Sequence, residues 1–511
     1  MRLSGLRKAL LGASASIVAL TTVQAADLPA KAKPIEYVKI CSLYGTGFYY
    51  IPGTETCIRI AGIVRIDTAI HGGIYDTPYW QGGATGAGQY NKDYFQTRSR
   101  LNLFLDTRTA TDYGVVRAVG GLAFDWTRGR ENIAGGYVES DYLFVQFAGF
   151  TIGKAVSQFD PQWALAKPYI ASGFLAGSNN ATGINQLAYT ASFGSGASAT
   201  ISLEDGVPYR SAGVVNTSQP FLGPFGVNIS GYLLAPTYGT VANTFVGNAQ
   251  TGDHVPDIVG NLRFDQAWGT AHVAVAAHEV HGTYYTPSNS DTGHPSSTWG
   301  YAVSGAFELK NLPTGVGDSL KVEATFANGA PKYVFGGAWD AYGAGRFAVA
   351  NGGTMAFGYI LDGVYSGTSS LNGSGISKTD SWDVSAFYEH YWTPQWRTSV
   401  FASYSHIAYG SAGNAALLVA FNGPVVTANS IAPGSKLSGN FDLNVAQIGT
   451  RTAWSPVKDL TLAAEFYYTR MDQNFTGTIN VVGVPGYAGA SPFVLRDQNL
   501  YNGGFQVQRS F

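Results

Sequence analysis

Apolar and polar residues alternate with a period of two in many segments of this 511-residue chain. In residues 319–326, one parity holds Leu320, Val322, Ala324 and Phe326, and the other holds Ser319, Lys321, Glu323 and Thr325. Segments 98–108 and 382–389 repeat the pattern, with Phe104 as an apolar exception among the polar positions of the first. Because successive side chains of a strand point to opposite faces, these segments are predicted to be strands with one apolar face.

A soluble antiparallel sheet shows the same alternation. The composition is therefore needed to distinguish a soluble sheet from one whose apolar face lies in lipid. Charged residues make up only 13% of the chain, against a usual share of about 25%. Glycine is abundant, with 65 residues, and beyond the N-terminus no apolar run reaches the length of a membrane-spanning helix. The fold is therefore predicted to be all-β, a transmembrane antiparallel β-barrel. The formal net charge is −2, and no basic patch points to a nucleic-acid partner.

Short and long connectors alternate along the predicted strands. Seven short connectors contain the Gly, Pro, Asp and Asn of turns, at 109–113, 148–150, 194–198, 266–269, 311–317, 393–396 and 455–459. Long polar or Gly-rich stretches separate them, near 71–95, 127–136, 157–184, 205–256, 281–299, 329–380, 409–440 and 471–501. Seven hairpins give fourteen strands, and the strands near Cys57 and at Phe511 bring the total to 16. Residues 225–234 could form another strand. We assign them to a loop, because an odd number of strands would place the two ends of the barrel on opposite sides of the membrane.

This alternation of short turns and long loops is typical of outer-membrane barrels, with the turns on the periplasmic side. A barrel of sixteen strands encloses a channel instead of a packed core. In the first strand, Ile58, Ile60, Val64 and Ile66 are predicted to face lipid, whereas Arg59, Arg65 and Asp67 face water inside. In the last strand, Phe511 ends an apolar parity that also contains Tyr501 and Phe505.

The N-terminus has the pattern of a cleaved signal peptide over residues 1–25. Arg2, Arg7 and Lys8 precede an apolar stretch of about 12 residues, and small residues stand at Val23 and Ala25. A membrane anchor is the alternative, but a spanning helix needs about 20 residues. Export to an oxidising compartment predicts a disulfide between Cys41 and Cys57, with two buried free thiols as the alternative. The mature chain then divides into a short N-terminal segment, 26–56, and the barrel, 57–511.

Three segments resemble one known family. The stretch EYVKICSLYGTGFYYIPGTETCIRIAGIVRID, residues 36–67, is similar to the N-terminal signature of the general porins of alphaproteobacteria. Residues 255–275 resemble the family's PDVVG segment, and the chain ends, like the family, on Arg-Ser-Phe. The resemblance implies a homotrimer in the outer-membrane lipid that passes small hydrophilic solutes and ions passively. It also implies that the third external loop folds inward. Separately, the C-terminal aromatic residue Phe511 on an apolar-faced last strand resembles the sorting signal read during outer-membrane assembly, and the alternative is that Phe511 is one more residue of the aromatic girdle.

That inward loop would be residues 157–184. Family members tend to have an acidic loop that faces basic wall residues, whereas Asp160 and Lys167 are the only charged residues of this loop. This departure weakens the expectation of the usual charge-selective constriction. The aromatic residues Trp163, Tyr169 and Phe174 favour neutral solutes such as sugars instead.

The wall arginines fit the family better. Five of them share the inward parity of the first three strands, namely Arg59, Arg65, Arg98, Arg100 and Arg117. We expect them to line the constriction and set a local positive field, because walls of low dielectric constant focus the field. The alternative is that each is a solvated lumen charge with no selective role.

No catalytic or cofactor motif is found. Residues 277–282, AHEVHG, do not form an HExxH motif, and His278 and His281 would point to opposite faces of a strand, so no metal site is expected. The sequence holds no phosphate-binding loop and no clear Ser-His-Asp arrangement. The predicted function is a porin without cofactor or enzymatic activity. The alternative is a barrel whose long loops, 205–256 and 329–380, act mainly in surface binding or adhesion.

Overall fold

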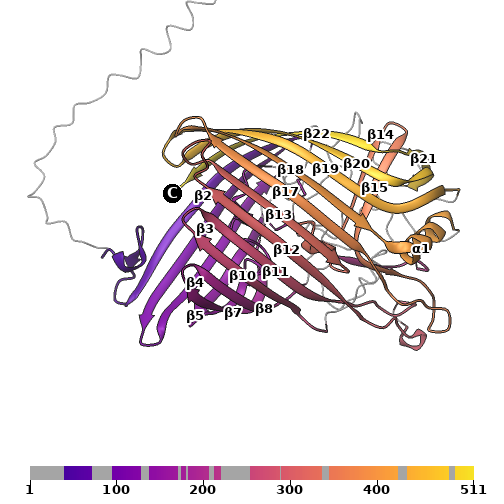
Figure 1. Cartoon of the computed structure of the whole chain (residues 1–511), viewed down its shortest axis with the longest axis horizontal. Helices are drawn as coiled ribbons and strands as arrows, with labels where there is room; N and C mark the ends of the chain where they lie inside the picture. The colour runs from indigo at the N-terminus through magenta and orange to yellow at the C-terminus, as the bar shows by residue number, and fades with distance from the viewer. Residues whose placement is uncertain are drawn as a thin grey trace, which may run out of the picture.

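The computed structural model describes residues 39–71, 95–127, 137–170, 174–175, 177–179, 182–206, 212–219, 254–287, 289–336, 345–423, 434–482 and 490–511. Within these ranges, 16 antiparallel strands form a closed barrel (Figure 1). The strands are β2 (Thr56–Ile70), β3 (Phe95–Thr111), β4 (Gly114–Thr127), β5 (Tyr137–Phe147), β6 (Phe150–Ala155), β7 (Ile184–Gly194), β8 (Ala197–Glu204), β10 (Asp257–Gln266), β11 (Gly269–Val280), β12 (Thr298–Lys310), β13 (Ser319–Asn328), β17 (Asp380–Tyr391), β18 (Trp396–Ala408), β19 (Lys436–Val457), β20 (Leu460–Val482) and β22 (Gln498–Ser510).

The barrel closes where its first and last strands meet. β2 pairs with β3 on one side and with β22 on the other, with Ile63 opposite Ser510. Beyond that pair, Gly62 and Phe511 exchange two backbone hydrogen bonds of 2.9 Å each. Closure leaves no strand edge facing lipid, as a membrane-spanning sheet requires. The predicted barrel and its strand number are confirmed.

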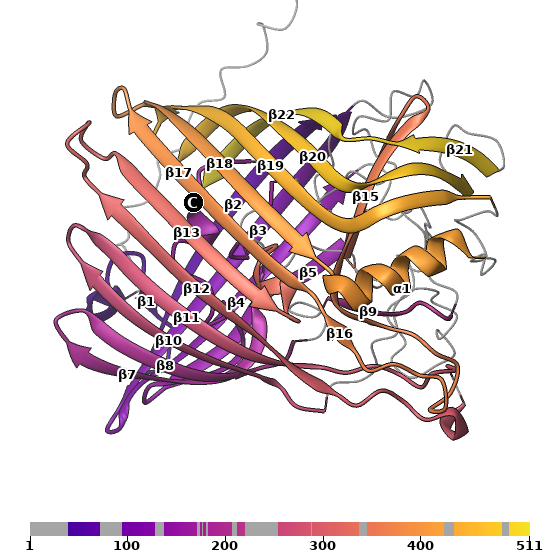
Figure 2. The ribbon, with the colours of Figure 1, turned by 45° about the vertical axis from the view of Figure 1, so that its right-hand side comes forward.

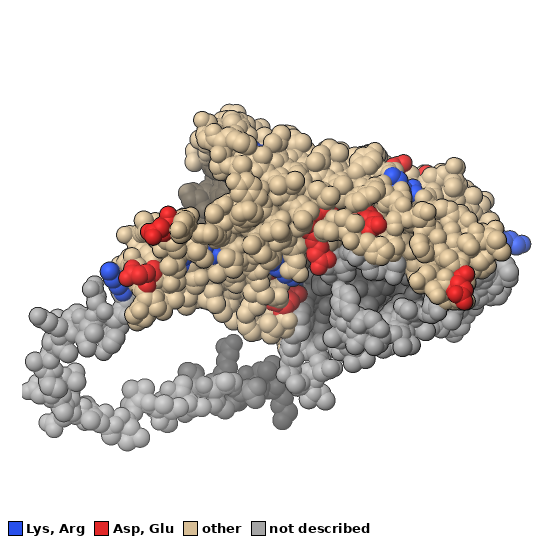
Figure 3. Space-filling view, turned by 90° about the horizontal axis from the view of Figure 1, so that it is seen from below, with Lys and Arg blue, Asp and Glu red and all other residues tan. Residues whose placement is uncertain are grey.

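The two faces of the wall follow the alternation of the sequence. On β2, the side chains of Ile60, Val64 and Ile66 are 41–47% exposed, whereas Asp67 is 2% exposed. Figure 3 shows one face of the molecule, on which Lys, Arg, Asp and Glu are sparse. The apolar exception Phe104 lies opposite Gly121 of β4, where a β-carbon would meet the phenyl ring at 3.2 Å. The ring therefore occupies space that a side chain at position 121 would otherwise fill.

The seven predicted short connectors are all turns between paired barrel strands. They lie at the end of the barrel that also holds the C-terminus (Figure 1). This is the periplasmic end of an outer-membrane barrel. No helix in the described part of the chain has the length and hydropathy needed to cross a bilayer.

At the opposite end, the long connectors contain regular structure that the sequence analysis assigned to loops. They contribute β9 (Gly213–Asn216), β14 (Gly345–Asn351), β15 (Thr354–Tyr365), β16 (Ser377–Lys378), β21 (Ala490–Leu495) and α1 (Gly410–Asn422). β15 pairs antiparallel with β14 and β16, and parallel with β9 and β21. Figure 2 shows α1 beside β15 at this end. Residues 225–234, expected in a loop, lie outside the described ranges.

This outer layer has its own apolar core. Phe357 of β15 packs against Phe421 of α1 and against Phe475 of β20, with ring centroids 5.4 and 4.8 Å apart. Tyr409, which precedes α1, donates a hydrogen bond of 2.5 Å to the carbonyl of Tyr359. The long connectors are therefore folded against one another and against the strands that carry them.

The N-terminal disulfide is confirmed. Cys41 and Cys57 are bonded, with their α-carbons 6.1 Å apart, and both are buried beside Phe48. The bridge fixes a short segment with η1 (Ser42–Tyr44) and β1 (Tyr49–Tyr50) against the start of β2. The predicted signal peptide, residues 1–25, lies outside the described ranges and stays a prediction.

Candidate constriction site

The connector between β6 and β7 is the third external loop, and its described residues are bonded to the inner wall. At its start, the Ser157 hydroxyl and the Gln158 amide donate to the carboxylate of Glu204 on β8, at 2.6 and 2.7 Å. The Gln158 carbonyl accepts from Asn261 of β10 at 2.6 Å. The loop therefore enters the lumen along β8 and β10.

Aromatic residues anchor the middle of the loop. Trp163 and Phe174 are buried in a cluster with Phe387, Phe401 and Tyr467, on β17, β18 and β20, and Tyr169 packs against that cluster. The ring centroids of Phe174 and Phe401 are 4.9 Å apart, and those of Tyr169 and Phe387 are 5.8 Å apart. These aromatic side chains hold the loop to the wall, so their presence gives no support to a preference for sugars.

Buried acidic and amide side chains of the wall accept hydrogen bonds from the loop backbone. Glu465 of β20 accepts from the Ile170 amide at 2.5 Å, and Asp383 of β17 accepts from Gly177 at 3.0 Å. Gln447 of β19 accepts from Leu175 at 2.6 Å. Each acceptor occupies the inward parity of its strand and satisfies a loop amide that would otherwise be buried without a partner.

The two charged residues of the loop are both buried. Lys167 is 7% exposed, and its Nζ lies 2.8 Å from Oε1 of Glu323 on β13. Asp160 is 6% exposed and accepts from the Asn179 amide at 3.3 Å. The structure thus places both residues in the packing of the loop, with the Lys167 charge neutralised by a wall carboxylate.

The described residues of the loop also contact the wall on both sides of one arc of the barrel. Near its tip, Ile170 approaches Gly504 of β22, and at its end Thr182 and Gly183 donate to the carbonyl of Asp141 on β5, at 3.1 and 3.0 Å. Between β22 and β5 around the closed barrel lie β2, β3 and β4. The inner face of these three strands carries the arginines that the sequence singled out.

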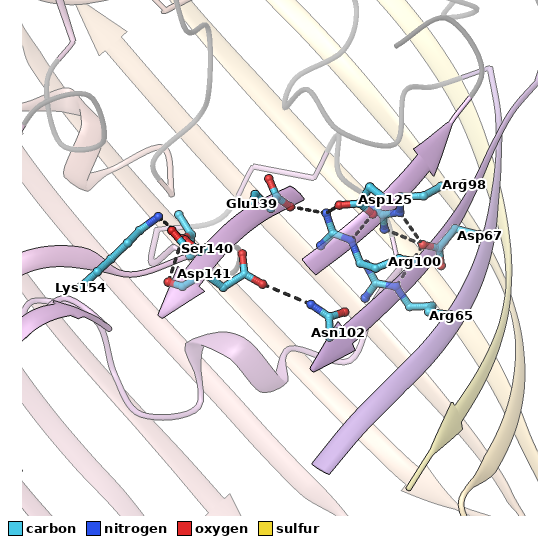
Figure 4. Close-up of polar contacts among 11 residues, drawn as sticks. Arg65, Asp67, Arg98, Arg100, Asn102, Asp125, Glu139, Ser140, Asp141 and Lys154 are labelled. Atoms are coloured by element: carbon cyan, nitrogen blue, oxygen red, sulfur yellow. Dashed lines mark hydrogen bonds and ion pairs between the residues drawn. The ribbon is translucent and has the colours of Figure 1, made fainter. Parts of the chain in front are cut away.

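Three of the predicted arginines meet in one charged network, shown in Figure 4. Arg65 and Arg98 both donate to Oδ2 of Asp67, with their Nε atoms at 3.0 and 2.9 Å. Arg100 donates to both carboxylate oxygens of Asp125, at 2.5 and 2.7 Å, and also to Glu139. We call Arg65, Arg98 and Arg100 the arginine row. Strand register builds the row, because Arg65 faces Arg100 and Asp67 faces Arg98 across β2 and β3.

The arginine row is balanced by acids. Its three guanidinium groups face the three carboxylates of Asp67, Asp125 and Glu139, so this part of the network carries no net charge. The network extends along β5 and β6, where Asp141 accepts from Asn102 at 3.2 Å and Lys154 donates to the Ser140 carbonyl at 2.6 Å. Among the described residues, the arginines that were predicted to set a positive field therefore alternate with carboxylates.

The other two predicted arginines lie nearer the periplasmic end. Arg117 donates to Asp106, with its Nη2 at 2.9 Å, and Arg108 binds the same carboxylate at 2.8 Å. Arg59 pairs with Asp106 in the register of β2 and β3, and its guanidinium lies 5.9 Å from the centre of the Phe48 ring. The structure therefore divides the five arginines between two levels of the lumen.

Sequence reasoning missed the acidic partners. Asp106 of β3 and Asp125 of β4 lie on the inward parity of their strands, as do the arginines they face. Along β5, parity would have placed Glu139 and Asp141 on the lipid side with the exposed Leu143 and Val145, but a register shift between β4 and β5 turns the two acids into the lumen. To pair each acid with a particular arginine, one must also know the register between neighbouring strands. That register is set by the turns and by closure of the barrel.

Comparison with known proteins agrees with this architecture. Residues 26–490 match the family model described as Porin subfamily. The chain is 27% identical over 284 residues to porin Omp2b of Brucella suis biovar 1 and 28% identical over the same length to Omp2b of Brucella canis. In both cases, the match covers 54% of this chain and 66% of the relative's own length.

A solved structure shares the fold. The outer membrane channel DcaP of Acinetobacter baumannii superposes with a TM-score of 0.54 at 13% sequence identity, over 90% of this chain and 99% of the other. At this identity, the likeness concerns the fold alone. The family model covers most of the chain, and the resemblance seen in the sequence is confirmed. The chain belongs to the porin subfamily and is an outer-membrane β-barrel.

Proposed function

We propose that the protein forms a passive, water-filled channel through which small hydrophilic solutes and ions diffuse, and that it assembles as a homotrimer. The observation that carries this proposal is the inward third loop, bonded to the wall from β8 to β20 while the charged arc of β2–β4 lies between its contacts on β22 and β5. A loop held in this way would narrow the lumen beside this arc. The family and the fold indicate a channel and not an enzyme.

The passage would run between the loop and the arginine row. Alternating guanidinium and carboxylate groups would offer a permeating solute both donors and acceptors in place of water. Because the three guanidinium groups of the arginine row are matched by the carboxylates of Asp67, Asp125 and Glu139, their joint field falls off quickly across the lumen and favours neither ion sign strongly. The expected channel therefore has weak ion selectivity and accepts neutral polar solutes.

The homotrimer is proposed from the resemblance to the general porins. Apolar side chains on the outside of the barrel are needed for contact with lipid, and a trimer would cover part of that surface with neighbouring copies. Cross-linking of the detergent-extracted protein tests the proposed trimeric state. This test is independent of whether the protein conducts solutes.

Swelling of liposomes that contain the purified protein tests diffusion directly. We expect swelling rates to fall smoothly as the size of a neutral sugar increases, with no saturation at high sugar concentration. Saturable uptake of one sugar would overturn passive diffusion in favour of a specific carrier site. Absence of swelling with every sugar would favour the alternative in which the outer layer of connectors serves surface binding.

A further inference from the structure

Outside the lumen, at the extracellular rim of the barrel, three side chains with metal-binding atoms come together. They are His254, Glu279 and His281, and one donor atom of each lies within 4.8 Å of the others. The imidazole rings of His254 and His281 are 4.0 Å apart between centroids. We propose that these residues bind one divalent transition-metal ion of the Zn²⁺ class. This site is independent of the diffusion channel.

The strand pairing of β10 and β11 assembles the cluster. Glu279 and His281 continue the outward parity of β11, on which Val273 and Val275 are exposed. His254 stands three positions before the start of β10, and Ile258 of β10 pairs with Ala277 of β11. The pairing of β10 with β11 therefore brings His254 close to Glu279 and His281, although His254 lies more than twenty residues away from both in the sequence.

The level of the site is marked by aromatic residues. Glu279 pairs with Trp299 of β12, and Ala277 pairs with Tyr301. Both aromatic side chains are exposed on the outer face, as expected for the girdle at the outer membrane–water interface. The site therefore lies at the level where the wall meets water, within reach of dissolved metal ions.

Glu279 supplies the observation that points to a cation. Its Oε2 atom is shielded from solvent and accepts no hydrogen bond within the described part of the chain. Shielding a carboxylate oxygen without a partner is unfavourable, because the oxygen loses water and gains nothing in return. A metal ion between Glu279 and the two imidazoles would satisfy this oxygen.

His281 is already oriented for binding. It is buried, and its Nδ1 lies 2.7 Å from the hydroxyl of Ser297. When Nδ1 carries the proton and donates to Ser297, the lone pair of Nε2 is left for a metal. Such a second contact of a ligating histidine fixes both the tautomer and the direction of its ring. His254 is exposed and can close onto an ion by rotating its side chain.

The donor set selects the kind of ion. Two imidazole nitrogens and one carboxylate oxygen suit Zn²⁺, Cu²⁺ or Ni²⁺, whereas Mg²⁺ and Ca²⁺ prefer oxygen ligands alone. Zn²⁺ binds nitrogen and oxygen at about 2.0–2.2 Å, which separates tetrahedral ligands by roughly 3.4 Å. The donors, which lie within 4.8 Å of one another, would need to approach by up to about 1.4 Å, and water would complete the coordination.

The proposal revises the expectation that the AHEVHG segment binds no metal. His278 does point the other way, into the barrel, where its Nδ1 lies 2.6 Å from Asp257 and its Nε2 lies 3.3 Å from Asp362. The second imidazole comes from His254 instead. A bound ion would tie the end of the connector before β10 to the end of β11.

Equilibrium dialysis of the untagged, detergent-purified protein against ZnCl₂, with metal analysis, tests the site. We expect the wild type to bind one more Zn²⁺ per chain than the E279Q/H281Q double variant. The matched control H71Q removes a histidine at the end of β2, outside the cluster, and should bind zinc as the wild type does. S297A should weaken binding by about 10- to 100-fold, as expected for loss of the group that orients a ligand.

Heat-modifiable migration on gels and far-ultraviolet circular dichroism establish that each variant is a folded barrel. If the folded double variant binds as much zinc as the wild type, these side chains are not the ligands. If the folded wild type binds no zinc beyond the level of the double variant, the site does not exist. A misfolded double variant would be replaced by H254Q, whose side chain is exposed, with the same two criteria.

Discussion

At the scale of single residues, large side chains are seated on glycines of the neighbouring strand. Phe511 illustrates this at the barrel seam, where a β-carbon on Gly62 would come within 2.3 Å of the phenyl ring. Gly62 interrupts the lipid-facing series of β2, and the ring of Phe511 occupies the gap. Arg509 shares the outward parity, but its Nη1 donates to the Lys458 carbonyl at 2.9 Å in the adjacent periplasmic turn.

Deleting Phe511 tests its predicted role in assembly. The truncated barrel should still fold in detergent, because loss of one partly exposed aromatic side chain costs at most about 1.5–3 kcal/mol. Its amount in the outer membrane should nevertheless fall severalfold, if the terminal aromatic residue is read during assembly. Quantitative immunoblots of membrane fractions measure this amount. G62V, which displaces the ring but keeps the residue, is the matched control, and normal levels of the deletion variant would contradict the role.

Replacing Arg98 and Arg100 together by alanine tests the charge balance of the lumen. The change leaves the carboxylates of Asp67, Asp125 and Glu139 with Arg65 alone, so the inner wall of β2–β5 gains net negative charge. In a salt gradient, the reversal potential should move toward that of a cation-selective channel. R509A, on the outer face, is the control. A reversal potential equal to that of the wild type would place the arginine row away from the permeation path.

Asp318, in the turn before β13, gives a prediction about acid stability. Burial raises the pKa of its carboxyl, but hydrogen bonds from Thr314, His390 and Tyr391 outweigh burial and hold the pKa below its ordinary value. A carboxylate with a lowered pKa stabilises the folded state above the unfolded pKa of about 3.9 and loses this effect as the pH falls toward the folded pKa.

The wild type should therefore unfold in urea at a higher concentration than D318N at pH 7. The gap between the two midpoints should stay constant down to about pH 5 and shrink progressively below about pH 4. Asp459, which is exposed in another periplasmic turn, provides the control variant D459N. A gap that does not depend on pH would mean that the Asp318 charge is not what stabilises this turn.

At the scale of elements, the third loop depends on its aromatic anchors. Replacing Trp163 and Phe174 with alanine removes two side chains from the cluster with Phe387 and Phe401, at a cost of about 3–5 kcal/mol for each. We expect the loop to leave the wall intermittently, and single-channel recordings to show more frequent partial closures than the wild type. W392A changes an exposed tryptophan at a periplasmic turn, and should record as the wild type does. Unchanged recordings from the double variant would contradict anchoring by this cluster.

The sequence predicted the barrel strands because each strand meets lipid on one face and water on the other, which imposes a period of two. It did not predict β15 or α1, because neither element has one face in lipid and the other in water. β15 is covered on both faces, so its run from Met355 to Leu361 shows no alternation, and such a run does not distinguish a strand from a buried helix. The start of α1 is rich in Gly, so the sequence did not indicate a helix there. The helix is stabilised by the packing of Phe421 on Phe357 and Phe441.

For the candidate site, parity placed the arginines on the inner face, but it could not place them along the barrel axis. Arg65 and Arg100 share one level because their strands pair in that register, while Arg117 lies lower beside Asp106. The fate of Lys167 was also beyond sequence reasoning. Its partner Glu323 lies more than 150 residues away, and their contact exists only because the loop crosses the lumen.

At the scale of the whole molecule, the interior of the barrel differs from one end of the barrel axis to the other. The extracellular end holds a folded layer of connectors, and the periplasmic end is bounded by short turns (Figures 1 and 2). Between these ends, the described residues of the third loop are bonded to the inner wall, and the arginine row lies on the inner face of β2 and β3. The disulfide pins the N-terminal segment to the periplasmic start of β2. This arrangement leaves the charged arc of β2–β4 as the proposed route for solutes.

Single-channel recording of the purified, folded wild-type protein in planar lipid bilayers tests this proposal most directly. A passive channel between the third loop and the arginine row requires a persistent open conductance at low voltage, proportional to the salt concentration and present without any added ligand. Folded protein that inserts into the bilayer but conducts no ions, or only in brief bursts, would contradict a water-filled channel.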